Sequence, residues 1–170
     1  RPLVVGPGLR TGLPIRINDP AQLGSDLVTQ AVAAREMKLG PTVVCSLGTA
    51  TAFVLMDGLG AVRGASIAPG MKISLESLAR HTAQLPWIDL ETPPPGAVGK
   101  TTVDSMKSGL LLGTACLVEG MTKRMEEELG ENVSLILTGT FAPLIAPLCR
   151  RECRTEPDLI LRGLRLIYER

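Results

Sequence analysis

Four short segments that contain glycine carry the groups most suited to chemistry. They are residues 6–12, 24–26, 47–49 and 138–140. Each is expected at the end of a strand or the start of a helix, where free backbone N–H groups converge and favour an anion. Thr49 and Thr140 add hydroxyl donors to the last two segments. Together, the four segments predict a site that binds phosphate.

Asp26 is the acidic residue within these segments. At the first turn of a helix, a carboxylate interacts favourably with the positive end of the helix dipole, which is the simpler interpretation. The same carboxylate could act as a general base that accepts a proton from a substrate hydroxyl. Taken alone, the residue favours the first interpretation.

Hydrophobic spacing predicts the elements that would position these segments. Alternating or continuous apolar runs predict strands, and a 3.6-residue period predicts helices. The predicted strands cover residues 3–5, 42–57 as a hairpin, 61–68 and 133–137, and the predicted helices cover 22–39, 71–82, 102–129, a short stretch from 142, and 158–168. This order predicts an α/β domain with a mixed sheet.

The predicted helix over residues 102–129 has two unusual features. Gly109, Gly113 and Gly120 each cost about 1 kcal/mol relative to alanine. They indicate close packing against another backbone, in the core or at a subunit contact. The charged end of this helix, where Glu126 follows Lys123, is interpreted as solvated.

The composition restricts the class of protein. With 170 residues, 45% hydrophobic and 2% aromatic, the chain is expected to form one domain, or a compact domain plus a fragment. A formal net charge of +1 argues against a nucleic-acid partner, whose phosphates attract an excess of cations. We expect no membrane span, because the apolar runs are only strand-length. Neither a signal peptide nor a disulfide pattern is visible, so we expect a cytoplasmic protein.

Eight segments in series resemble type III pantothenate kinases over essentially the whole chain. They are residues 6–12, 23–26, 31–34, 47–51, 67–70, 81–86, 99–100 and 166–170. Each is a weak signal by itself, and the specificity comes from their common order. The resemblance implies a ribonuclease H-like, actin-like ATPase fold, with a mixed sheet flanked by helices. It also implies ATP-dependent phosphorylation of pantothenate to 4'-phosphopantothenate, the first step of coenzyme A biosynthesis.

The resemblance implies roles for individual residues. Asp26 matches the general base toward the pantothenate hydroxyl, and Gly24 matches a glycine that contacts the substrate. Thr82 matches a threonine that reaches pantothenate from the neighbouring subunit. The positions that match nucleotide-binding residues are Gly48, Thr49, Thr51 and Gly139.

The resemblance further divides the chain. Residues 1–40 resemble the end of a first actin-like domain, and residues 41–170 resemble a complete second domain. The N-terminal Asp-x-Gly-Asn-Thr phosphate loop of the family is absent from this sequence, and a start at Arg1 is expected of part of a longer chain. Family resemblance implies a homodimer or a heterodimer with a related subunit. It also implies Mg²⁺ and a monovalent cation, potassium or ammonium.

Four positions depart from the family pattern. Leu27 stands where an arginine can fork onto the pantothenate carboxylate, so Arg10 or Arg16 would have to serve that group instead. Ser46 occupies the position of a family aspartate at the metal site, and a neutral hydroxyl is a poorer cation ligand. The other two departures are Thr140 for a second glycine and Thr101 for an asparagine.

These departures leave three interpretations open. The protein is an active pantothenate kinase with rearranged contacts, a catalytically degenerate subunit that pairs with or regulates a complete partner, or a binding protein that keeps the fold without phosphoryl transfer. The presence of Asp26 and of the Gly48-Thr49 loop favours the active kinase.

Overall fold

A five-stranded mixed sheet forms the centre of the computed structural model, which describes residues 3–170. Its spatial order is β3-β2-β1-β4-β5. The strands are β1 (Thr42–Leu47), β2 (Ala50–Met56), β3 (Val62–Pro69), β4 (Ser134–Thr138) and β5 (Arg154–Thr155). β1 pairs antiparallel with β2 and parallel with β4. The predicted α/β domain with a mixed sheet is confirmed.

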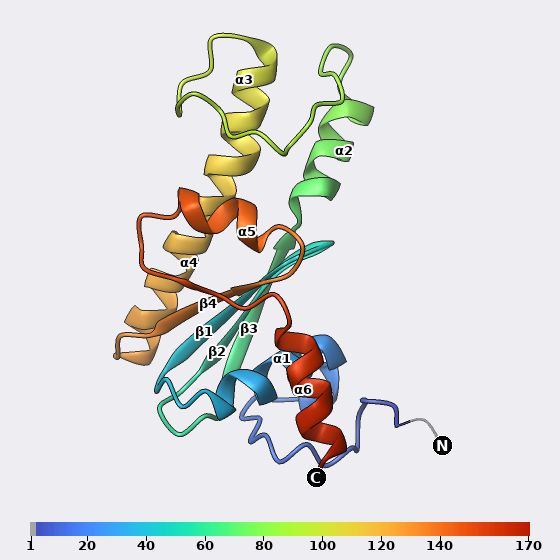
Figure 1. Cartoon of the computed structure of the whole chain (residues 1–170), viewed down its shortest axis with the longest axis vertical. Helices are drawn as coiled ribbons and strands as arrows, with labels where there is room; N and C mark the ends of the chain where they lie inside the picture. The colour runs from blue at the N-terminus through green and yellow to red at the C-terminus, as the bar shows by residue number, and fades with distance from the viewer. Residues whose placement is uncertain (1–2) are drawn as a thin grey trace.

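Helices cover both faces of this sheet (Figure 1). The helical segments of the described chain are η1 (Pro20–Gln22), α1 (Ser25–Glu36), α2 (Met71–His81), α3 (Thr102–Lys107), η2 (Ser108–Leu112), α4 (Gly113–Leu129), α5 (Ala142–Ile145), η3 (Ala146–Leu148) and α6 (Leu159–Tyr168). α1 and α6 pack on one face, whereas α4 and α5 pack on the other. α2 and α3 extend beyond the edge of the sheet where β3 ends. In residues 3–170, no helix is both long and apolar enough to cross a membrane.

The alternation of side chains along β1 divides the core in two. Val44 faces α1 and α6, and the neighbouring Val43 and Cys45 face α4. All three are buried, at 1% exposure or less. A central strand covered on both faces must be apolar at successive positions, which is why β1 reads as a continuous hydrophobic run.

Two predicted elements differ from the structure. Residues 3–5 were expected to form a strand, but they adopt no regular structure and Val4 is 78% exposed. The first strand-like pairing with the sheet in the described chain is instead a single bridge between Ile15 and Val62. β5 was not predicted because its two residues are too few to produce a periodic pattern.

The predicted helix over residues 102–129 is continuous but contains a π-helical turn, η2, between α3 and α4. The expectation that its glycines pack closely against another backbone is wrong within this chain. Nothing lies within 4 Å of a Cβ built at Gly109, Gly113 or Gly120, and all three face outward. Of the two places predicted for these glycines, packing in the core is excluded in this chain, and a subunit contact stays a prediction.

Glu126 was interpreted as part of a solvated helix end, and this is wrong. Its side chain is buried, and it accepts hydrogen bonds from Arg151 Nη1 (3.0 Å) and Nη2 (2.5 Å) and from the backbone N–H of Val133 (3.0 Å). These donors, Arg151 foremost, lower the pKa of the Glu126 carboxyl to about 2. The ion pair ties α4 to the start of β4 and to the segment before β5.

We predict that Glu126→Gln lowers the free energy of unfolding by about 2 kcal/mol at pH 7, because the substitution leaves Arg151 without its buried counter-charge. A depressed pKa in the folded state stabilises the protein above the ordinary value of 4.5. The difference between variant and wild type should therefore shrink as the pH falls from 4.5 toward 2.

Urea denaturation at several pH values measures this difference, with Glu127→Gln at an exposed neighbouring position as the control. A destabilisation that is the same at pH 7 and pH 3 would contradict the assignment.

Candidate functional site

The carboxyl ends of β1, β3 and β4 meet at one edge of the sheet. Ser46 pairs with Thr138 in the parallel ladder between β1 and β4. Ala50, just after the β1–β2 turn, pairs with Pro69 at the end of β3. The sheet thus brings together two of the predicted anion-binding segments, residues 47–49 and 138–140.

Gly139 allows these two segments to touch. It has φ of +91°, and a Cβ at this position would lie 2.6 Å from the carbonyl oxygen of Leu47. The next turn is fixed by a hydrogen bond of 3.1 Å from Phe141 N to the same oxygen. Any side chain at position 139 would push the two loops apart.

Gly70 supports the other side of the β1–β2 turn. A Cβ on Gly70 would overlap the carbonyl oxygens of Gly48 and Thr49, and Gly70 N donates to Thr49 O at 3.1 Å. Gly48 N already donates to Ala50 O at 3.1 Å, so this predicted anion donor is used inside the turn. The Thr49 side chain is exposed at the tip.

The remaining positions that the family resemblance singled out differ in exposure. Gly139 is half-buried and Thr140 is exposed, so both border open surface. Thr51 lies inside β2 with 1% exposure and presents no accessible surface to a ligand in this structure. Thr101 is the N-cap of α3, and its hydroxyl accepts from Asp104 N at 3.1 Å.

Asp26 lies in the first turn of α1, and its carboxylate is exposed. The N-cap residue is Gly24, which supplies no side-chain cap. A Cβ on Gly24 would lie 2.7 Å from Asp26 Oδ1, so the absence of a side chain leaves room for the carboxylate. The position of the Asp26 carboxylate therefore depends on the absence of a side chain at Gly24.

Gln30 joins α1 to the end of β1, and the sequence reasoning missed it. Gln30 Nε2 donates to Ser46 Oγ at 3.3 Å, although the Gln30 side chain is only 5% exposed. Its Oε1 atom is buried without a hydrogen-bond partner. Such an orphaned acceptor costs about 1–3 kcal/mol. The signal that could have found it is the spacing, because residues 26 and 30 share one face of a helix.

The side chains around Ser46 do not provide the ligand atoms that a divalent cation needs. Among residues 3–170, no group of three His, Cys, Asp or Glu side chains comes together. The Ser46 hydroxyl already accepts a hydrogen bond from Gln30, and both groups are neutral. Mg²⁺ prefers carboxylate and phosphate oxygens. No step is therefore assigned to a metal held at Ser46.

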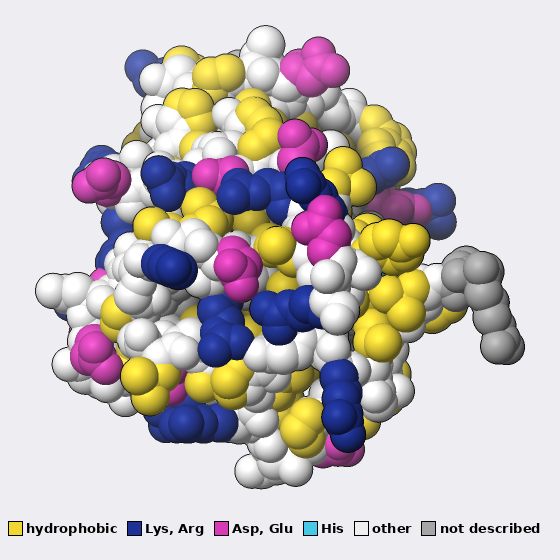
Figure 2. Space-filling model, turned by 60° about the horizontal axis from the view of Figure 1, so that its bottom comes forward, with side chains coloured by type: hydrophobic (Ala, Val, Ile, Leu, Met, Phe, Trp, Pro, Cys, Tyr) yellow, Lys and Arg dark blue, Asp and Glu magenta, His cyan; other side chains and the backbone are white. Residues whose placement is uncertain are grey.

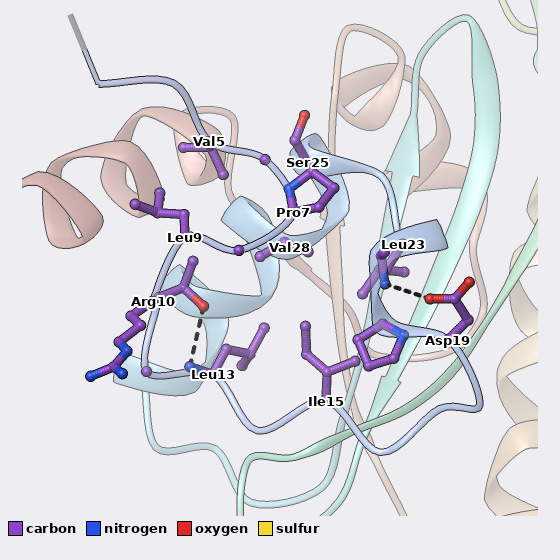
Figure 3. A pocket seen from close by; sticks show the side chains of 16 residues that line it. Val5, Pro7, Leu9, Arg10, Leu13, Ile15, Asp19, Leu23, Ser25 and Val28 are labelled. Carbon is purple, nitrogen blue, oxygen red and sulfur yellow. Dashed lines mark hydrogen bonds between the residues drawn. The ribbon is translucent and has the colours of Figure 1, made fainter.

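A cavity of about 730 Å³ lies beside the start of α1 (Figure 3). Its wall consists of residues 5–13, with Ile15, Asp19, Leu23 and Val28 on the other sides. Ser25, the neighbour of Asp26, also lines it. Most of the lining is apolar, whereas Arg10, Asp19 and Ser25 supply charge and hydrogen-bonding groups. A ligand with an aliphatic body and polar ends would suit this surface.

The structure separates the two arginines that could replace a guanidinium at position 27. Arg10 lines the cavity, whereas Arg16 approaches Asp57 at 3.9 Å. Leu27 itself is 5% exposed and belongs to the core between α1 and the sheet. Of the two, Arg10 is the one at the cavity, and Figure 3 shows its guanidinium on the outer side of the loop, directed away from Leu13 and Ile15.

Thr82 does not come near Asp26 within one chain. It follows α2, and its hydroxyl donates to Leu78 O at 2.7 Å and accepts from Leu85 N at 3.3 Å. Figure 1 shows α2 leading away from the sheet, on the side opposite to α1.

Solved structures of known proteins share this fold. A protein described as a Baf family transcriptional activator from Campylobacter jejuni superposes with a TM-score of 0.68 at 18% identity, covering 95% of this chain and 70% of that one. A protein described as a 2-dehydro-3-deoxygalactonokinase from Sinorhizobium meliloti gives 0.62 at 17% identity, covering 83% and 58%. This likeness supports the predicted ribonuclease H-like, actin-like ATPase fold, a mixed sheet flanked by helices.

The sequence identifies the family within this class. The profile of type III pantothenate kinases matches residues 1–124. Curated type III pantothenate kinases from Syntrophobacter fumaroxidans and Moorella thermoacetica are each 41% identical over 170 residues, and the one from Thermomicrobium roseum is 43% identical over 169. The chain belongs to the type III pantothenate kinase family. It spans 66% of the length of the first two relatives and 65% of the third.

We predict that Gly24→Ala displaces the Asp26 carboxylate while the fold persists, because the obstructed atom is the end of a flexible side chain. The loss of stability should stay below about 1 kcal/mol. NMR of the Asp26 carboxyl carbon measures the displacement, and Gly64→Ala is the matched control because nothing lies within 4 Å of a Cβ there. An unchanged Asp26 resonance, or general unfolding, would contradict the packing described.

Proposed function

We propose that the protein transfers the γ-phosphoryl group of ATP to the hydroxyl of pantothenate, giving 4'-phosphopantothenate and ADP, the first step of coenzyme A biosynthesis. Membership of the family supports the reaction class. The observation that carries the proposal is the position of Asp26, in the helical turn beside the cavity, on a helix that Gln30 joins to Ser46 at the end of β1.

Asp26 is the proposed general base. Its exposed carboxylate accepts the proton of the pantothenate hydroxyl while the hydroxyl oxygen bonds to the γ-phosphorus and the bond from that phosphorus to the ADP oxygen breaks. Gly24 keeps the space around Asp26 Oδ1 clear. The chemistry demands little more of the base than position, because phosphoryl transfer depends mainly on alignment and charge.

The glycine-lined edge of the sheet is the proposed phosphate site. Gly48, Thr49 and Gly139 border it, and backbone N–H groups in such turns favour anions. Thr51 is the proposed support beneath this turn, since its side chain is buried. ATP is the nucleotide that the family implies, and Mg²⁺ and a monovalent cation stay proposals without an assigned ligand in this chain.

Arg10 is the proposed partner of the pantothenate carboxylate. It lines the cavity, and its guanidinium can form two parallel hydrogen bonds with a carboxylate. The apolar lining suits the dimethyl and methylene groups of the substrate. Position 27 cannot supply this cation, because leucine occupies it inside the core.

A second subunit is part of the proposal. Thr82 lies away from α1 in one chain, so it would contact pantothenate in the site of a partner, in a homodimer or a heterodimer with a related subunit. Exposed glycines on α4 and η2 suit close approach of another helix. Residues 1–40 and 41–170 are proposed as parts of two actin-like domains, in a cytoplasmic protein.

Two observations favour a second candidate function. Leu27 removes a cation at the substrate position, and Ser46 removes a carboxylate at the metal position. A degenerate subunit that pairs with or regulates a complete partner would have both properties.

We predict that Asp26→Asn lowers kcat by about 10²–10⁴-fold, because the amide keeps the shape but cannot accept the proton. Mass spectrometry of phosphopantothenate formed from ATP and pantothenate measures this loss. Asp158→Asn is the control, since Asp158 is also exposed at a helix start and supplies no side-chain cap.

The two candidate functions give different results. Turnover by the purified protein that depends on Asp26 supports the kinase. A folded sample that is inactive alone and gains turnover only when mixed with a complete homologue would contradict it and support the degenerate subunit.

A further inference from the structure

We propose that Arg35 and Arg170 position the loop that walls the substrate cavity, and so determine the affinity for the pantothenate-like substrate. This inference rests on the proposed function for its substrate, but its structural part stands on hydrogen bonds within the chain. The loop comprises residues 6–12, all of which line the cavity.

Arg170 lies against the downstream end of this loop. Its Nη1 donates to the carbonyl oxygen of Thr11 at 2.6 Å, and its Nη2 approaches Glu36 Oε1 at 3.4 Å. Gly12 has φ of +71°, and a Cβ there would overlap the guanidinium of Arg170. The arginine therefore occupies the volume that a side chain at position 12 would need.

Arg35 holds the next carbonyl group. Its Nη1 donates to Gly12 O at 2.5 Å. The stem of Arg35 lies along the β2–β3 turn, since a Cβ on Gly60 would be 2.8 Å from Arg35 Cγ. Two guanidinium groups, from the end of α1 and from the last residue of the chain, thus hold two consecutive carbonyls.

The upstream part of the loop has few internal ties. Within residues 6–10, the backbone hydrogen bond is Leu9 N to Gly6 O at 3.2 Å, and Gly8 has φ of +90°. Thr11 is buried, and its hydroxyl accepts from Leu13 N at 3.3 Å. The anchored carbonyls at 11 and 12 are therefore the fixed points from which the wall extends.

The charges around the anchor favour this geometry. Figure 2 views this end of the molecule and shows basic side chains interspersed with acidic ones. Glu36 on α1 faces Arg170 at 3.4 Å, so the carboxylate stands beside this guanidinium. The guanidinium of Arg170 thereby has an ionic partner on one nitrogen and a carbonyl on the other.

The two hydrogen bonds from Arg35 and Arg170 to the loop, here called the anchor, lie far enough from Asp26 to predict a change in KM and not in kcat. Arg35 lies nine residues from Asp26 on the same helix, which corresponds to about 13 Å along its axis. Loss of the anchor should therefore move the cavity wall without moving the proposed base. Both arginines are positioning residues and neither contacts the reacting atoms.

The test uses Arg170→Met, which keeps the aliphatic stem without the donors, and Arg170→Lys, which keeps the charge and one donor. Arg162→Met, on α6 just before Arg170, is the control, because Arg162 pairs with Glu156 on the surface. Hydrogen exchange of the amides of residues 6–10 and the KM and kcat for pantothenate are measured in each. The KM for ATP is the internal reference.

For Arg170→Met we expect faster exchange in residues 6–10, a KM for pantothenate raised about tenfold, and kcat and the KM for ATP within about twofold. Arg170→Lys should recover part of both effects. Unchanged exchange in the loop, or a fall in kcat at constant KM, would overturn the inference. If the wild type has no turnover, the proposed function fails, and the exchange result still decides whether the arginines hold the loop.

Discussion

The close approach of two glycines to one backbone turn is the constraint on which the site depends. Gly70 follows β3 and Gly139 follows β4, and each occupies a place where a Cβ would collide with the segment from Leu47 to Thr49. Three strand ends can therefore meet at one edge of the sheet, with the tip of the β1–β2 turn left exposed. The parallel register between β1 and β4 sets this meeting point, because Ser46 and Thr138 are partners.

The helix that carries Asp26 is held against this edge by contacts along its length. Gln30 reaches Ser46 at the end of β1. α6 crosses α1 so closely that a Cβ on Gly163 would overlap the carbonyl oxygen of Thr29. The last element of the chain thus fixes the helix with the proposed base, and Arg170 extends the same support to the cavity wall. Gly70 and Gly139 shape the β1–β2 turn, and α6 and Arg170 support the helix and the loop beside it, so all of them contribute to one proposed site.

The strongly periodic parts of this structure were predictable, and the non-local polar contacts were not. The hairpin of β1 and β2, the buried strand β4 and the helices α1 and α2 follow from apolar spacing, because one or both faces of each pack against the core. Glu126 was misread because a charged residue on a helix end is usually solvated, and only the distant Arg151 reverses that expectation. Gln30 and Arg170 escaped notice for the same reason, since their partners lie 16 and 159 residues away in sequence. The glycines of α4 lower helix propensity, and no neighbouring group within this chain explains why they are there.

The most direct test of the account is an NMR titration of the protein with a non-hydrolysable ATP analogue. We expect the amide resonances of Gly48, Thr49 and Gly139 to shift together, because these residues border one proposed phosphate site at the carboxyl ends of β1 and β4. Resonances at the opposite edge, near Thr42 and Met56, should stay in place. Shifts confined to that opposite edge, or no saturable shift at the glycine-lined edge, would show that the glycine-lined edge does not bind the nucleotide.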